Sequence, residues 1–489
     1  MTWFGVSKDD ASGPASTASS SPVASLADLT ESLPASELKR RLTQRQLTMM
    51  TIGGAIGVGL FLGSSVTIRL AGPGVILSYV LSAVVALIVA YAIAEMAVVH
   101  PVAGSFGVYA QTYLNEWSGF TVRITYAFVQ IIAIGAEVTA VAIYCSLWFP
   151  GVPQWFWVVG VSVGLIAINA MQVGNFAEFE YWFAIIKVIA IVAFILVGLG
   201  LIFGLGPVPA VGFSNLTSHG GLFPNGLKGV WLAMSLTLTS YMGVEIIGVT
   251  AGEASQPEKT IPRAMRTVSL RLILFYVLSM TVMLSMTPWD RMGSGITGSP
   301  FVLAFATIGI PYAAKIMNLV VITAALSSAN TNLYLTSRTL FSLSRDGYVP
   351  EALGGLGGNG VPYFALIVST AGMVAAILLA VFAPGRAFLL LYGVAVAGMF
   401  FVWIVCLLAH VAFRRSLGRT RVARLPIRLL FSPYSQIGGL IALGAITIST
   451  FYVEGLRYSV PSFALFLLAI TAFYWELKRR NRNKVEGQP

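Results

Sequence analysis

Residues Thr51–Ser65 read TIGGAIGVGLFLGSS and open the first long apolar stretch of the chain. The stretch carries five glycines where a plain membrane span would carry leucines. Glycine weakens a helix by about 1 kcal/mol relative to alanine, so this density predicts a helix that opens partway across a bilayer. A second stretch, Leu236–Gly252, reads LTLTSYMGVEIIGVTAG and places Gly243 beside Glu245. Two apolar helices interrupted at corresponding places of a chain indicate the substrate site of a transporter.

The composition places the chain in a membrane. Hydrophobic residues make up 57% of it, charged residues only 10%, and the mean hydropathy is +0.82, far from the values of soluble domains. Cys145 and Cys406 both lie in apolar segments, which excludes a disulfide framework and a cysteine metal cluster. A net charge of +11 would suggest nucleic acid in a soluble protein. Here the basic residues gather in a few loops and at the end of the chain, so the charge indicates topology and no nucleic-acid partner is expected.

Apolar runs of about 20 residues predict an all-α integral membrane protein with twelve transmembrane helices. The predicted spans are 47–70, 75–98, 119–149, 154–172, 178–204, 226–250, 265–287, 312–341, 362–383, 387–412, 435–454 and 459–476. The loops are too short for a soluble domain. Residues 1–46 are polar, rich in Ser, Ala, Thr and Pro and without a signal-peptide core. We therefore expect a disordered N-terminal tail over 1–46, a transporter domain over 47–476 and a basic C-terminal tail over 477–489.

The positions of Lys and Arg predict the orientation. Most of the 30 basic residues fall on one side of the twelve-span scheme: in both tails and in the loops around 259–271, 338–345 and 414–428. Because cytoplasmic loops are enriched in Lys and Arg, both termini are expected in the cytoplasm.

A set of motifs in a fixed order resembles the amino acid permease family of the amino acid, polyamine and organocation (APC) superfamily. The motifs are GAIGVGLF in the first span, AEMAVVHPVAGSFGVYA (94–110), AEVTA (136–140), FEYWFAIIKV (179–188), GVEIIGVTAGEASQPEKTIPRA (243–264), NLVVITAALSSANTNLYLTSRTLFSLSRDGYVP (318–350) and HVAFRR (410–415). The resemblance runs from about residue 40 to 415 and more loosely to 476. It implies a 5+5 inverted repeat with discontinuous helices 1 and 6, followed by two appended helices.

An amino acid at the bilayer midplane needs donors for its carboxylate and acceptors for its ammonium group. Unwinding of the first span would free N–H groups at the positive end of a half-helix, and unwinding of the sixth would free carbonyl groups. Side-chain selectivity is expected beside the breaks, where no carboxylate is obviously poised for a cationic side chain, which favours a neutral substrate. The alternative is that the glycines only permit close helix packing. The expected substrate-binding residues are Ala55, Ile56, Gly57, Val58, Gly59, Leu60, Thr239, Tyr241, Met242, Gly243 and Val244.

Charged residues inside spans are costly and are therefore functional candidates. Lys187 lies well inside the fifth span. In related carriers that lack sodium dependence, a lysine on this span takes the place of a sodium ion. By that resemblance Lys187 would contact the backbone of 53–55 and Ser327 or Ser328, and would couple proton movement to transport. The alternative is a static ion pair between helices.

Four further charges lie inside or beside spans. Glu245, just past the second break, is expected to act as a gate, a proton carrier or the partner of a buried cation. Glu137, in the third span, is expected either to take part in transport or to form a structural hydrogen bond. Arg123, in the same span, can extend to the membrane surface. Glu95 resembles part of the family's cytoplasmic loop network, for which a solvated ion pair is the simpler interpretation.

The sequence lacks the residues that other functions require. It has no GxxxxGK[ST] phosphate loop, no histidine cluster with metal-ligand spacing and no convincing Ser–His–Asp set. We expect no cofactor, no metal and no enzyme activity. The sequence predicts an importer that carries an amino acid across the cytoplasmic membrane by proton symport with alternating access. Two alternatives remain: an exchanger without net proton coupling, and an amino acid sensor that signals through its tails.

Overall fold

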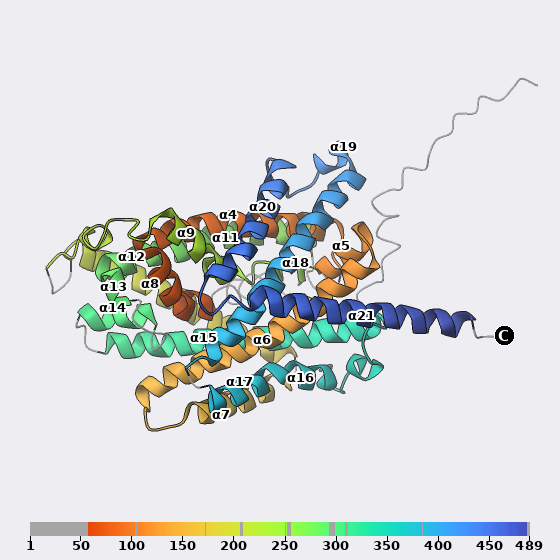
Figure 1. The fold of residues 1–489 in the computed structure, drawn as a ribbon, viewed down its shortest axis with the longest axis horizontal. Helices are drawn as coiled ribbons and strands as arrows, with labels where there is room; N and C mark the ends of the chain where they lie inside the picture. The colour runs from red at the N-terminus through yellow and green to blue at the C-terminus, as the bar shows by residue number, and fades with distance from the viewer. Residues whose placement is uncertain are drawn as a thin grey trace, which may run out of the picture. The chain divides into compact units, whose positions relative to one another are not determined.

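The computed structural model describes residues 57–102, 105–171, 173–205, 209–249, 251, 256–292, 299–308, 312–383 and 385–486. The expected tail at 1–46 and the candidate residues Ala55 and Ile56 lie outside these ranges, as does the expected partner of Lys187 at 53–55. The regular secondary structure of the described residues is helical (Figure 1).

Each predicted apolar segment holds helical structure. In chain order the elements are η1 (Gly59–Gly63), α3 (Ser64–Ala71), η2 (Gly72–Gly74), α4 (Val75–Val99), α5 (Ser105–Tyr113), α6 (Glu116–Trp148), α7 (Gln154–Asn169), α8 (Val173–Ile202), η3 (Ser214–Leu216), α9 (Gly226–Thr237), η4 (Thr239–Tyr241), α10 (Ile246–Val249), α11 (Pro257–Ile273), η6 (Leu274–Leu278), α12 (Ser279–Met286), α13 (Trp289–Met292), α14 (Pro300–Ile308), α15 (Ala313–Arg345), η7 (Glu351–Gly354), α16 (Tyr363–Ser369), α17 (Ala371–Phe382), α18 (Ala387–Leu417), α19 (Arg419–Val422), α20 (Tyr434–Ser449), η8 (Thr450–Tyr452) and α21 (Ser459–Glu486).

Eight helices of the described ranges are long and apolar enough to cross a membrane. They cover 59–99, 116–148, 180–202, 313–345, 363–382, 387–417, 434–452 and 459–480. Two shorter apolar helical stretches, Gln154–Asn169 and Leu274–Met286, fall in predicted spans as well. The segment around the second break is divided into α9, η4 and α10, so none of these helices is long enough to cross a membrane alone. The count of twelve spans and the inverted repeat stay predictions.

Helices α6, α15 and α18 form the centre that positions the site. Figure 1 shows α6 and α15 side by side, and α18 also packs closely on α6. Helix α6 begins at an N-cap, where the Asn115 side chain accepts a hydrogen bond from the Ser118 amide at 2.9 Å. Small residues bring α17 against α6, because a Cβ on Gly372 would lie 1.7 Å from the Ile131 carbonyl oxygen.

Helix α15, like α6, buries a stripe of polar side chains. Ser327, Ser328, Asn330 and Thr331 are all at most 3% exposed, and α15 packs on both α6 and α8. Buried polar groups are costly unless they form hydrogen bonds. The stripe is therefore where the polar chemistry of neighbouring helices should be found.

Candidate substrate and coupling site

The second interrupted segment is broken at Met242–Glu245. Helix α9 ends at Thr237, η4 adds one tight turn, and the chain resumes a helix only at Ile246. Gly243 has φ of +106°, a conformation open to glycine and strained for other residues. The two carboxylate oxygens of Glu245 accept the Gly243 amide at 3.0 and 2.9 Å. The predicted break is confirmed, and Glu245 stabilises it by taking an amide that a helix would have paired.

The first glycine-rich segment was predicted to be interrupted. Its described part begins at Gly57, is helical from Val58 and continues into the π-helical turn η1, so no interruption is seen from Val58 onward. A Cβ on Gly57 would lie 2.8 Å from Ser328 Oγ. A Cβ on Gly59 would lie 2.8 Å from the Tyr392 hydroxyl and 3.1 Å from the Ser240 Cα. The packing role of these glycines is therefore real. It also brings the two glycine-containing segments together, so packing and site formation depend on the same residues.

A small cavity lies between the two segments. The cavity is lined by Gly57, Val58, Gly59, Gln130, Ala133, Glu137, Thr239, Ser240, Met242, Gly243, Glu245, Ser328, Asn332 and Tyr392. Polar side chains of α6 and α15 line one side, and Gly243 together with Thr239, Ser240, Met242 and Glu245 lines the side of the second break.

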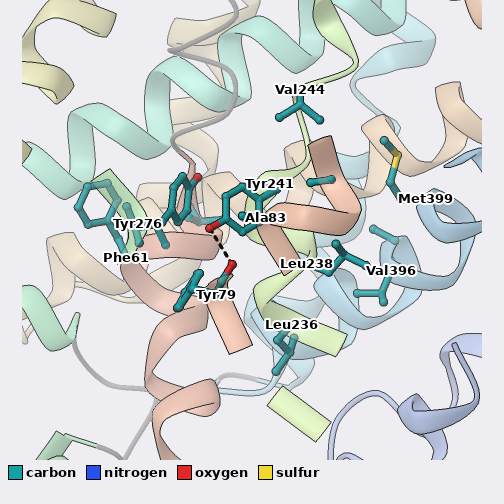
Figure 2. Packing of buried hydrophobic residues seen from close by; sticks show 14 of the residues in the cluster. Phe61, Tyr79, Ala83, Leu236, Leu238, Tyr241, Val244, Tyr276, Val396 and Met399 are labelled. Atoms are coloured by element: carbon teal, nitrogen blue, oxygen red, sulfur yellow. Dashed lines mark hydrogen bonds between the residues drawn. The ribbon is translucent and has the colours of Figure 1, made fainter. Parts of the chain in front are cut away.

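Three of the expected substrate-binding residues belong to the packed core. Leu60, Tyr241 and Val244 are at most 3% exposed and lie among buried apolar side chains. The Tyr241 hydroxyl donates to the Tyr79 carbonyl at 3.1 Å, and its ring centroid lies 4.6 Å from that of Tyr276 (Figure 2). The Tyr276 hydroxyl donates to the Ser240 carbonyl at 2.6 Å. These tyrosines stabilise the break from behind, while Thr239 and Met242 reach the cavity.

Glu137 forms the acidic part of the cavity wall. Its carboxylate accepts a hydrogen bond from Ser328 Oγ and two from Asn332 Nδ2, each of the latter at 3.1 Å. Gln130 Nε2 donates to Asn332 Oδ1 at 2.9 Å, which fixes the amide of Asn332. Glu137 and Glu245 thus place two carboxylates at the cavity. From the sequence, no carboxylate was expected beside the side chain of the substrate.

Lys187 lies behind this wall on α8 and is fully buried. The charges of Glu180 and Glu137 both act on its ammonium group. Ser327 donates to Glu180 Oε1 at 2.5 Å, whereas Ser328 donates to Glu137. The two serines expected near Lys187 therefore each bind a carboxyl group that faces it.

The sequence interpretation missed several residues of this site. Glu180 is the clearest case, since it lies seven residues before Lys187, almost two helical turns, and therefore on the same face of α8. Asn332 follows Ser328 by four residues on α15, which is the corresponding signal on that helix. Gln130, Ser240 and Tyr392 carry no comparable local signal.

Glu95 is fully buried and not part of a solvated network as expected from the sequence. It accepts Arg414 Nε at 2.7 Å, Arg414 Nη2 at 2.5 Å and the Leu429 amide at 2.7 Å, with His410 Nε2 at 3.4 Å. These contacts join α4, α18 and the segment before α20. A buried charge with several donors can be tolerated where a lone charge cannot.

Arg123 is only 4% exposed and does not extend to a membrane surface. It pairs with Asp346, at the end of α15, and donates to Gln111 Oε1 at 3.2 Å. A Cβ on Gly107 would lie 2.2 Å from Arg123 Cγ, so this glycine lets α5 pack on the arginine. The charge serves to hold α5, α6 and the end of α15 together.

His100 and Tyr113 form a second buried polar contact, just beyond the end of α4. His100 Nε2 lies 2.5 Å from the Tyr113 hydroxyl. Burial lowers the pKa of His100 and raises the pKa of Tyr113 to about 12. Tyr113 is therefore neutral at physiological pH. A nitrogen of the neutral His100 imidazole can accept a hydrogen bond from its hydroxyl.

A helical membrane protein with a polar cavity beside an interrupted helix is typical of small-molecule transporters. The comparisons with known proteins agree: the model of the amino acid permease family matches residues 46–484. The chain belongs to the amino acid permease family. Its members are transporters and not enzymes.

Several curated relatives cover nearly the whole chain. The chain is 40% identical over 442 residues to the uncharacterized amino acid permease YtnA of Bacillus subtilis (strain 168), covering 90% of this chain and 95% of that protein. It is 36% identical to the probable threonine/serine transporter YbxG of the same organism, with 90% and 95% covered. It is 38% identical to the aromatic amino acid transport protein AroP of Salmonella typhimurium (strain SL1344), also with 90% and 95% covered.

Proposed function

We propose that this permease imports an amino acid by proton symport, with alternating access to the cavity between its two glycine-containing segments. The observation that carries the proposal is the position of this cavity. It is lined by Gly57–Gly59 and by the break at Met242–Glu245, and it borders a buried cluster of Glu137, Glu180 and Lys187. Ionisable groups inside membrane segments mark ion and proton pathways.

The substrate would lie with its two ends on different parts of the cavity wall. Its carboxylate would face the backbone amides at Gly57–Gly59, at the start of the helical turn that leads into α3, because helix starts favour anions. Its ammonium group would face the carbonyl groups of the second break and the carboxylate of Glu137. This orientation uses the backbone for the parts that all amino acids share.

The side chain would lie against polar uncharged groups. Thr239 and Tyr392 hydrogen-bond each other at 2.6 Å, and Gln130, Ser240 and Asn332 complete this part of the wall. Glu137 and Glu245 are already engaged by donors of the chain, which favours a substrate with a neutral side chain. The names of the relatives include threonine and serine as well as aromatic amino acids, and these are the first substrates to test.

The membrane arrangement that we propose has twelve spans. Spans 1–5 and 6–10 would form the inverted repeat, and spans 11 and 12 would be appended to it. The protein would lie in the plasma membrane, with both termini in the cytoplasm. The basic residues of the inter-span loops and of the last helical turns up to Glu486 support this orientation.

Uptake into liposomes tests the proposal. The purified protein is reconstituted, an inward proton gradient is imposed, and radiolabelled serine, threonine, phenylalanine, tyrosine and tryptophan are tested singly. Concentrative uptake that collapses with a protonophore supports symport. Counterflow from preloaded vesicles without gradient-driven accumulation would establish the exchanger instead. Binding without either flux would establish the sensor.

A further inference from the structure

The buried cluster behind the cavity contains two carboxyl groups and one amine. Glu180 and Lys187 on α8 are each 0% exposed, and Glu137 on α6 is 5% exposed. Both carboxyl groups lie within electrostatic range of Lys187. Together the three groups carry a net charge of −1 when all of them are ionised. An unbalanced charge is costly inside a membrane protein.

Helix α15 gives each carboxyl group its own hydroxyl. Ser327 Oγ donates to Glu180 Oε1 at 2.5 Å, and its neighbour Ser328 donates to Glu137 Oε1. The second oxygen of Glu180 is buried and has no hydrogen bond among the described residues, and the same holds for the Thr331 hydroxyl. Thr331 lies close enough to act on the Glu180 carboxyl group. A proton on Glu180 Oε2 would therefore find an acceptor in Thr331.

The other elements packed around the cluster supply no balancing cation in the described residues. The polar groups that α15 turns to the two carboxyl groups are uncharged: Ser327, Ser328, Asn330, Thr331 and Asn332. The second break contributes Glu245, whose carboxylate binds the Gly243 amide and adds a further negative charge at the cavity. A zwitterionic amino acid brings no net charge. The loaded site therefore approaches neutrality only by holding protons.

We propose that Glu180 is the second carboxyl group of the coupling site, and that Glu137 and Glu180 share one exchangeable proton near the charged Lys187. Glu137 lines the cavity, whereas Glu180 lies outside its lining, so the two positions differ in their exposure to the substrate. The inference rests on the proposed symport and names the residue that completes it. Because the three groups interact, they titrate as one unit, and their pKa values belong to the cluster and not to single residues.

The proton transfer is balanced and involves no other reactant. When the substrate ammonium group approaches Glu137, it favours the carboxylate form of that residue. The Glu137 carboxyl group then releases its proton and the Glu180 carboxylate takes one up, while Lys187 stays charged. The result is a Glu137 carboxylate, a charged Lys187 and a neutral Glu180. The number of protons is unchanged, and the substrate and the proton occupy the site together.

Glu180→Gln tests the assignment, because glutamine keeps the shape and an acceptor for Ser327 but cannot hold the exchangeable proton. The expected result is a loss of about tenfold or more in gradient-driven uptake, while counterflow at equal pH stays within about twofold of the unmodified protein. Glu180→Asp should restore part of the gradient-driven uptake. Glu116→Gln, which removes an exposed carboxylate bound to Lys478, is the matched control and should change neither flux.

Two results decide against the proposal. If Glu180→Gln accumulates substrate as well as the unmodified protein, Glu180 carries no coupling proton. If the unmodified protein shows no gradient-driven uptake of serine, threonine or phenylalanine but does show counterflow, both the symport and this inference are overturned. The first result leaves the proposed symport intact, so the two failures are distinguishable.

Ser327→Ala keeps the proposal testable if Glu180→Gln does not fold. The variant retains both carboxyl groups and removes a donor that favours the carboxylate form of Glu180. The pH of half-maximal uptake should move upward, with little change in the substrate KM at the acidic end of the profile. Ser328→Ala should raise KM instead, because Ser328 lines the cavity. An unchanged pH profile for Ser327→Ala would overturn the role of Glu180.

Discussion

Gly59 and Ser240 bring the two glycine-containing segments into backbone contact: a Cβ on Gly59 would lie 3.1 Å from the Ser240 Cα. The Tyr392 hydroxyl occupies the adjoining space at 2.8 Å and hydrogen-bonds Thr239 at 2.6 Å. Neither a backbone atom nor a tyrosine held in this way can move aside without cost. The two segments can approach this closely because residue 59 is glycine and has no Cβ. The shape of the cavity therefore depends on Gly59.

Gly59→Ala is therefore expected to impair transport. An added methyl group at this contact costs about 1–3 kcal/mol in a well-packed site, and uptake should fall by about tenfold or more. Gly63→Ala is the matched control, since its nearest neighbours lie 3.9 and 4.0 Å away. Initial rates of uptake in liposomes measure both. Equal rates for the two variants would show that the contact at Gly59 does not set the cavity.

Lys187→Met should remove the dependence of uptake on the proton gradient. The substitution approximately keeps the length of the side chain and removes the amine that interacts electrostatically with Glu180 and Glu137. Gradient-driven uptake should fall to the level seen without a gradient. Lys315→Met, at an exposed position of α15, serves as control. If Lys187→Met retains the pH dependence of the unmodified protein, Lys187 is only a static ion-pair partner.

Glu95 and Arg414 should contribute strongly to stability, because both oxygens of the buried carboxylate accept hydrogen bonds from the arginine. Removing one partner of a buried pair costs about 3–5 kcal/mol, so Arg414→Ala should lower the free energy of unfolding by that amount. Arg415→Ala, at the exposed neighbouring position, should cost little. Chemical unfolding in detergent micelles measures both. The double variant Glu95→Gln/Arg414→Met should lose less than the sum of its single changes.

His100 should make the stability of the protein sensitive to acid. Because burial lowers its pKa in the folded chain, the unfolded chain binds this proton more readily. Its contribution is complete above the ordinary imidazole pKa of about 6.5 and is lost as pH falls through the lower folded value. His100→Gln should therefore reduce the drop in melting temperature between pH 7.5 and pH 5, two values chosen about one unit or more on either side of that pKa. An unchanged drop in the His100→Gln variant would show that His100 does not cause the acid sensitivity.

The sequence by itself determined the helical architecture and the break at Gly243. Apolar runs must form helices in a membrane because every backbone group needs a partner, and a φ of +106° at position 243 suits glycine. The resemblance to amino acid permeases, which the family match confirms, also followed from motifs in chain order. Lys187 was recognisable as a candidate because a charge in an apolar run is costly wherever it folds.

Only the tertiary structure decided how the side chains are distributed around the site. Tyr241 and Met242 are neighbours at a broken helix, yet the first packs against Tyr79 and Tyr276 and the second reaches the cavity. Helical periodicity ends at such a break, so the sequence predicts no direction for either side chain. Ser327 and Glu180 meet although 147 residues separate them. A local pattern can place each of them on a helix, but the packing of α8 against α15 determines that they meet.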